Sequence, residues 1–158
     1  MALSGPEITA IVHGLLGTVF LMAFAGSYAE LIQLTHAGMK RVKWGITIMA
    51  GTAIIIDLLG DLIYTVYRAP VPDSARSLIK AGSTPWVHEI GMELKEHVAH
   101  FVPVLMLIAL FMVVYYKEDL VKSKELRAIT AGLLVTAMLV TLVAFGLGAY
   151  ITKVQPIK

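Results

Sequence analysis

Four long apolar segments follow one another along the chain, separated by short polar stretches. Each is longer than the roughly 20 apolar residues that a helix needs to cross a bilayer. The segments cover about residues 7–34, 43–67, 85–116 and 127–152. Ser4-Gly-Pro-Glu7 is typical of a capping box with proline in the first helical turn, and Thr84-Pro85 is typical of an N-cap followed by a proline. The pattern predicts an all-α transmembrane four-helix bundle that forms a single domain over residues 1–158.

The third segment is longer than a bilayer requires. A helix from Pro85 to Tyr116 would run roughly 48 Å at about 1.5 Å per residue, so its first turns should stand outside the hydrocarbon. Pro103 removes a backbone hydrogen bond to the carbonyl of Ala99, which predicts a kink next to His100. Ser77 to Lys80 could add a short amphipathic turn on the outer surface.

The basic residues of the connections predict how the bundle lies in the membrane. The stretch from His36 to Lys43 has three basic residues and no acid, whereas the N-terminal flank has no basic residue. Because Lys and Arg near helix ends mark the cytoplasmic side, both termini are expected on the outer, non-cytoplasmic side. The connection from Lys117 to Arg127 agrees, with four basic residues and three acids, while the second connection opposes this topology. We expect a multi-pass protein of a prokaryotic cytoplasmic membrane.

Composition narrows the possible chemistry. The chain is 58% hydrophobic and only 15% charged, and its mean hydropathy of +0.79 is far above that of a soluble protein. The net charge of +2 and the scattered basic residues exclude nucleic-acid binding. Because the sequence has no cysteine, a metal would have to be held by histidine, carboxylate or water.

Ionisable residues recur at one depth in three of the four segments. Such groups within a span cost on the order of 2.5–3.5 kcal/mol on insertion scales and normally face the bundle interior. Counting about 1.5 Å per residue from the inner boundary places five of them in the outer third of the bilayer. They are His13, Asp57, Asp61, His97 and His100. Glu93, His97 and His100 share one helical stripe, and Asp57, Asp61 and Tyr64 share another that can face it. His36 and His88 are expected to be exposed residues near helix ends.

One function that fits these residues is haem binding. A low-spin b haem in a helix bundle needs two imidazoles from different helices at matching depth, and His13 with His97 or His100 supplies them. Small residues beside His13 would leave room for a planar ligand. In this hypothesis Asp57 and Asp61 hydrogen-bond to a ligand histidine, to a propionate-binding group or to a quinol.

A resemblance supports the same hypothesis. Val12-His-Gly-Leu-Leu-Gly17 together with Glu96-His-Val-Ala-His-Phe-Val-Pro103 resembles the histidine-bearing helices of four-helix b-type membrane cytochromes. The resemblance covers the first and third segments, about a third of the chain. It implies an electron-transfer subunit that passes electrons between a quinol or another reductant and an acceptor at the membrane surface.

Two further functions stay open. His13, Asp57, Asp61, Glu93, His97 and His100 could instead bind a transition-metal ion such as zinc, copper, iron or manganese. The same cluster could also be a proton relay or an ion-pair network in an accessory subunit without catalysis. Beyond the lipid bilayer, the expected partners are other membrane subunits or further copies of this chain.

Overall fold

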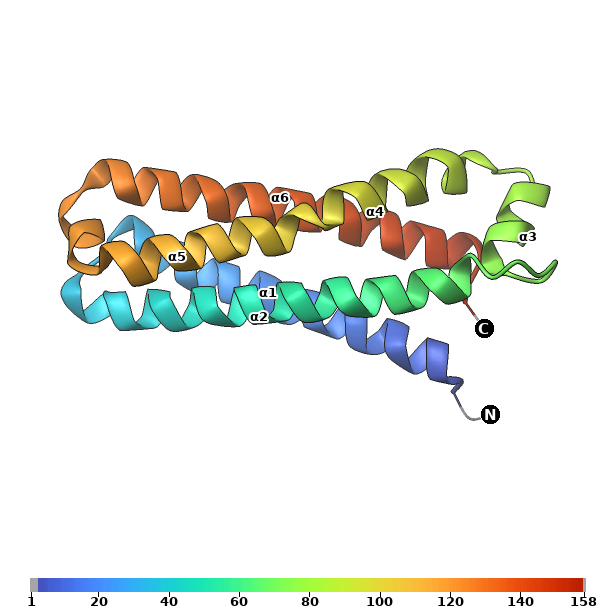
Figure 1. Cartoon of the computed structure of the whole chain (residues 1–158), viewed down its shortest axis with the longest axis horizontal. Helices are drawn as coiled ribbons and strands as arrows, with labels where there is room; N and C mark the ends of the chain where they lie inside the picture. Colours follow the sequence, from blue (N-terminus) through green and yellow to red (C-terminus); the bar gives the residue numbers. More distant parts are fainter. Residues whose placement is uncertain (1–2, 158) are drawn as a thin grey trace.

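The computed structural model describes residues 3–157, and all its regular elements there are helical. Long helices lie side by side in one bundle (Figure 1). The elements are α1 (Gly5–Ile32), α2 (His36–Tyr67), α3 (Ala75–Ala81), the π-helix η1 (Val87–Met92), α4 (Glu93–Ala99), α5 (Phe101–Lys122) and α6 (Lys124–Val154). Both ends of the chain lie at the end of the bundle that holds α3 (Figure 1), which we call the terminal end.

Four stretches are long and apolar enough to cross a membrane, so the predicted all-α four-helix transmembrane bundle is confirmed in length and composition. They are Gly5–Ile32, His36–Tyr67, Val87–Lys122 and Lys124–Val154. Many large apolar side chains on their surfaces are exposed, including Leu15, Met22, Leu58 and Phe111. These surfaces are suited to lipid, and the chain is a multi-pass integral membrane protein with lipid as its surroundings.

Helix boundaries depart from the sequence pattern in the connections. The stretch from 36 to 43, predicted to be a loop, is the start of α2, because the Thr35 side chain caps the helix by accepting a hydrogen bond from Gly38 N at 3.0 Å. The connection predicted at 117–127 is mostly helical, but its start coincides with a break: Lys117 has a non-helical backbone with φ 35° that kinks α5, and Ser123 then separates α5 from α6. The capping box at the start of α1 is confirmed, with Ser4 N donating to Glu7 Oε2 at 2.7 Å.

The third span is broken rather than continuous. The span begins as η1, and among the described residues no side chain caps this helix. The predicted cap by the Thr84 side chain is therefore absent. The backbone carbonyl oxygen of Thr84 does accept a hydrogen bond from Val87 N. A second break separates α4 from α5 at His100, three residues before Pro103. The predicted kink is therefore confirmed. The predicted turn at Ser77 to Lys80 is confirmed as part of α3.

The breaks change what the third span packs against. α5 packs on both α2 and α6, whereas α4 and η1 pack on α6. In Figure 1, α4 correspondingly diverges from α2 toward the terminal end. The main apolar core lies where α1, α2, α5 and α6 pack together, around Phe20, Met49, Met106 and Leu134. A smaller core joins α2, α3 and η1 through Tyr67, Ile79 and Val87. Between these cores the bundle is less tightly filled.

Candidate functional site

A cavity of about 360 Å³ lies inside the terminal half of the bundle. Residues from all four spans form its walls, and most of them are apolar. Four glycines are among them: Gly14, Gly17, Gly60 and Gly148. A Cβ atom on Gly60 would lie 3.5 Å from Cε1 of His13, so the imidazole ring lies directly against the backbone of α2. The small residues that flank His13 thus shape the inner wall of the cavity.

Two of the predicted ligand histidines line this cavity from different spans. His13 comes from α1, and His100 comes from the break between α4 and α5. His13 Nδ1 is buried and has no hydrogen-bond partner among the described residues. Buried polar atoms in proteins are nearly always paired, so this nitrogen is an exception, and because it has almost no accessible surface it does not open onto the cavity.

His97 is placed differently from His100. Both side chains are exposed, but His97 is not among the cavity residues, and its Nδ1 lies 2.6 Å from the carbonyl oxygen of Glu93 on its own helix. Of the two histidines predicted as alternatives on the third span, His100 is therefore the one that lines the cavity.

His100 is held by the carboxylates of α2. Its Nδ1 lies 2.7 Å from Oδ1 of Asp57, and its Nε2 lies 4.0 Å from Oδ1 of Asp61. Because a carboxylate accepts a hydrogen bond, Nδ1 carries the proton in the neutral ring and Nε2 keeps its lone pair. A carboxylate that fixes the tautomer of a histidine in this way is the usual neighbour of a metal-binding imidazole.

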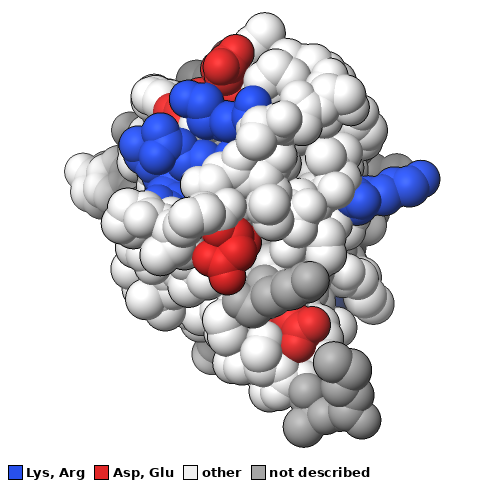
Figure 2. All heavy atoms as spheres, turned by 90° about the vertical axis from the view of Figure 1, so that its right-hand side faces the viewer, with Lys and Arg blue, Asp and Glu red and all other residues white. Residues whose placement is uncertain are grey.

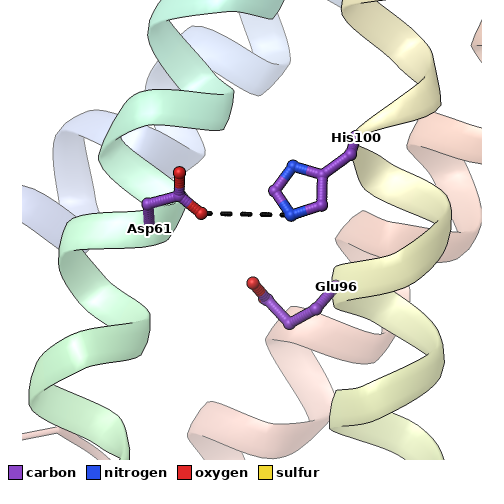
Figure 3. A group of neighbouring side chains, drawn as sticks. All are labelled: Asp61, Glu96 and His100. Atoms are coloured by element: carbon purple, nitrogen blue, oxygen red, sulfur yellow. Dashed lines mark ion pairs between the residues drawn. The ribbon is translucent and has the colours of Figure 1, made fainter.

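Glu96 joins His100 and Asp61 in one group. One ligand atom from each of the three lies within 4.8 Å of the others. Figure 3 shows Asp61 projecting from α2 toward His100 and Glu96 on the facing segment. Glu96 also accepts a hydrogen bond from Lys95 Nζ at 2.8 Å, and the two side chains are only 11% and 14% exposed. The lysine neutralises one acid at the cavity wall, and Gly148 leaves space for its stem.

The two polar stripes predicted on the second and third spans do face each other. Asp57 and Asp61 lie opposite His100, and Tyr64 donates to Glu93 Oε1 at 3.1 Å. Glu93 is thus bound to Tyr64 rather than grouped with Asp61 and His100.

The predicted site residues leave out both Glu96 and Lys95. For Glu96 the sequence does carry a signal, because its spacing of four residues from His100 allows the two side chains to share a ligand set or a hydrogen bond. No comparable signal marks Lys95.

A second polar group lies beside the cavity, and only Tyr67 of this group is among the cavity residues. Tyr67 and His88 are almost wholly buried, with 0% and 5% exposure, and Tyr67 Oη lies 3.2 Å from His88 Nδ1. Arg76 of α3 donates from Nε to His88 Nε2 at 3.1 Å. The prediction that His88 is exposed is therefore wrong, because η1 turns it inward and Tyr67 and Arg76 cover it. His36 is exposed, as predicted, beside Glu118.

Comparison of the chain with known protein families, with curated proteins and with solved structures found no match. The cavity and its residues are therefore the evidence for function.

Proposed function

We propose that the cavity binds a b-type haem between His13 and His100, and that the chain is an electron-transfer subunit of a membrane. The observation that carries the proposal is that these two imidazoles, from different spans, line one largely apolar cavity. Bis-histidine ligation inside a helix bundle requires this pairing. The glycines on the walls are consistent with a flat ligand that approaches the helix backbones closely.

The carboxylates have a defined part in this proposal. Asp57 holds the proton of His100 Nδ1 and so leaves Nε2 free to ligate iron. Asp61 and Glu96 stand next to Nε2 and could accept a proton when a quinol is oxidised. A haem, when bound, supplies a one-electron change between ferrous and ferric iron. In the topology expected from the basic residues, it would lie near the outer face of a prokaryotic cytoplasmic membrane.

A visible spectrum of the purified protein tests the haem proposal. Wild type, expressed with haem supplied, should show a sharp reduced α band of the b type after dithionite. His13→Ala and His100→Ala should lose the low-spin spectrum, whereas the matched control His97→Ala should keep it. A wild-type protein without haem, or a spectrum that depends on His97 and not on His100, would overturn the proposal.

A second candidate function is supported by the group of Asp61, Glu96 and His100. With Asp57 on the far nitrogen of the imidazole, this group offers three ligand atoms for zinc, copper, iron or manganese. In that case the purified protein should be free of haem and contain about one equivalent of metal by elemental analysis. Asp61→Asn should lose the metal, and Glu89→Gln, an exposed acid in the same span, should not.

A further inference from the structure

Three basic residues lie at the terminal end of the bundle, outside the cavity. Arg68 is the C-cap of α2, and Arg76 and Lys80 lie four residues apart on α3, a spacing that puts both on one helical face. We call Arg68, Arg76 and Lys80 the basic cluster. Figure 2 looks onto the terminal end and shows Lys and Arg side chains gathered on one side of it.

Hydrogen bonds fix the two arginines of the basic cluster in place. Arg68 Nη1 donates to Tyr64 Oη at 3.0 Å, and Arg76 Nε donates to His88 Nε2 at 3.1 Å. The two acceptors are linked through Glu93, whose Oε1 accepts from Tyr64 Oη at 3.1 Å and lies 3.8 Å from His88 Nε2. The arginines are therefore parts of one polar network rather than separate surface residues.

Positive charge is in excess around this network. All three members of the basic cluster act electrostatically on His88, and Glu93 is the one acid that does so among the described residues. The cluster forms no salt bridge with a carboxylate in the described chain, whereas Arg41 at the opposite end pairs with Glu30 at 2.8 Å.

The basic cluster is open to an anion from outside. Arg68 and Lys80 are exposed, and Arg76 is half-buried. A guanidinium group has several N–H donors, and each arginine of the cluster uses one of them for its hydrogen bond within the described chain. Donors on all three side chains are thus left for oxygen atoms of a ligand.

The cluster stands at the depth of the lipid head groups. α2 has 32 residues and so runs roughly 48 Å, well beyond a hydrocarbon core of roughly 30 Å. Trp86 and Tyr150 lie at the same end with their rings stacked at 5.8 Å, and both are partly exposed, as is typical of side chains at a membrane interface. On α3, Leu78 is 42% exposed and Ile79 is buried. This short helix therefore offers charge and apolar surface together, which suits a lipid.

We propose that the basic cluster binds the phosphate group of an anionic phospholipid in the leaflet at the terminal end of the bundle. Arginine binds phosphate oxygens through paired N–H groups, and lysine adds a point charge. The proposal goes beyond the haem function and does not rest on it. It also accounts for the second connection, whose basic residues oppose the topology expected from the other two: here they serve a ligand.

A lipid competition on the whole purified chain tests the proposal. Protein stripped of lipid in detergent is incubated with equal amounts of phosphatidylglycerol and phosphatidylcholine of the same acyl chains, and native mass spectrometry gives the ratio of the two that are bound. Wild type should prefer phosphatidylglycerol by about tenfold or more, since each basic residue near the surface contributes about fivefold. Arg68→Gln combined with Lys80→Gln should lower this preference at least about fivefold. Arg76 is kept because it holds His88.

The matched control is Lys122→Gln combined with Lys124→Gln, which removes the same charge from exposed residues at the opposite end of the bundle. It should leave the preference about as in wild type. Lys80→Glu covers the case in which the double variant folds poorly, because this exposed side chain supports no contact in the network, and its preference should fall at least as far.

Two results would overturn the proposal. One is a preference that is unchanged in the cluster variants or falls equally in the control, since either shows that the cluster does not select the lipid. The other is loss of the preference in excess inorganic phosphate, which would make this a site for soluble anions. Neither result depends on whether haem is bound, so the haem proposal stands or falls separately.

Discussion

Replacing Asp57 with asparagine isolates what this carboxylate does for His100. The side chain keeps its shape, but the charge beside Nδ1 is lost. A carboxylate at 2.7 Å draws the imidazole proton and makes the opposite nitrogen a stronger electron donor. Stronger donation stabilises ferric over ferrous iron, so removing the charge should raise the midpoint potential of the proposed haem.

The magnitude follows from the geometry and the exposure of the pair. Hydrogen bonds to charged groups contribute about 1.5–3 kcal/mol. His100 is 49% exposed and Asp57 is 26% exposed, so solvent weakens this bond to about 1 kcal/mol or less. About 1.4 kcal/mol is a factor of ten in an equilibrium constant, which for one electron corresponds to about 59 mV. We therefore expect Asp57→Asn to raise the potential by up to about 40 mV.

A redox titration followed by the reduced α band measures this shift, with Asp73→Asn as the matched control. Asp73 is an exposed acid in the loop between α2 and α3 and has no part in the cavity. The spectrum should stay low-spin in both variants. An unchanged potential in Asp57→Asn, or an equal rise in Asp73→Asn, would show that the carboxylate does not act through His100.

Three further predictions concern packing and the cavity. Ser27 Oγ is buried without a partner among the described residues, so Ser27→Ala should raise the stability in denaturant titrations by about 1 kcal/mol; a loss of stability would mean that the hydroxyl is paired after all. Arg127 donates to two carbonyl oxygens at the end of α5, and Arg127→Met should lower the stability by about 1–2 kcal/mol in the same assay, whereas a neutral result would show that water replaces it. Gly60→Leu should project into the cavity beside His13 and abolish haem binding, read as the Soret absorbance per protein, while Gly132→Leu, with open space around it, should not; full haem content in the first variant would place the haem elsewhere.

The sequence was sufficient for the helices but not for their exact ends. Apolar length alone identified four spans, because a bilayer requires long apolar helices and almost nothing else in the chain has that length. The stretches 36–43 and 117–127 were predicted as loops because they are polar, yet Thr35 and Ser123 cap helices there. In the second stretch only Lys117 and Ser123 depart from the helical backbone. A polar stretch in water can be either a loop or the end of a helix, so the hydrophobic pattern could not tell which of the two forms here.

Part of the site followed from spacing and part did not. Helical periodicity placed Asp57 and Asp61 opposite His100, since residues four apart share a face. It could not choose between His97 and His100, because a π-helix and a break at His100 change the rotation of the span along its length. The pairing of His88 with Tyr67 was also invisible, since it joins residues whose approach depends on how α3 folds back.

The proposed haem and the alternative metal ion would compete for the same nitrogen. Asp57 orients His100 equally well for either, and Nε2 can serve only one of them. The two functions differ in their demand on His13, which a porphyrin needs as its second ligand and which is outside the group of Asp61, Glu96 and His100. A His13→Ala variant that loses its bound group therefore points to haem, whereas one that keeps metal while Asp61→Asn loses it points to the ion.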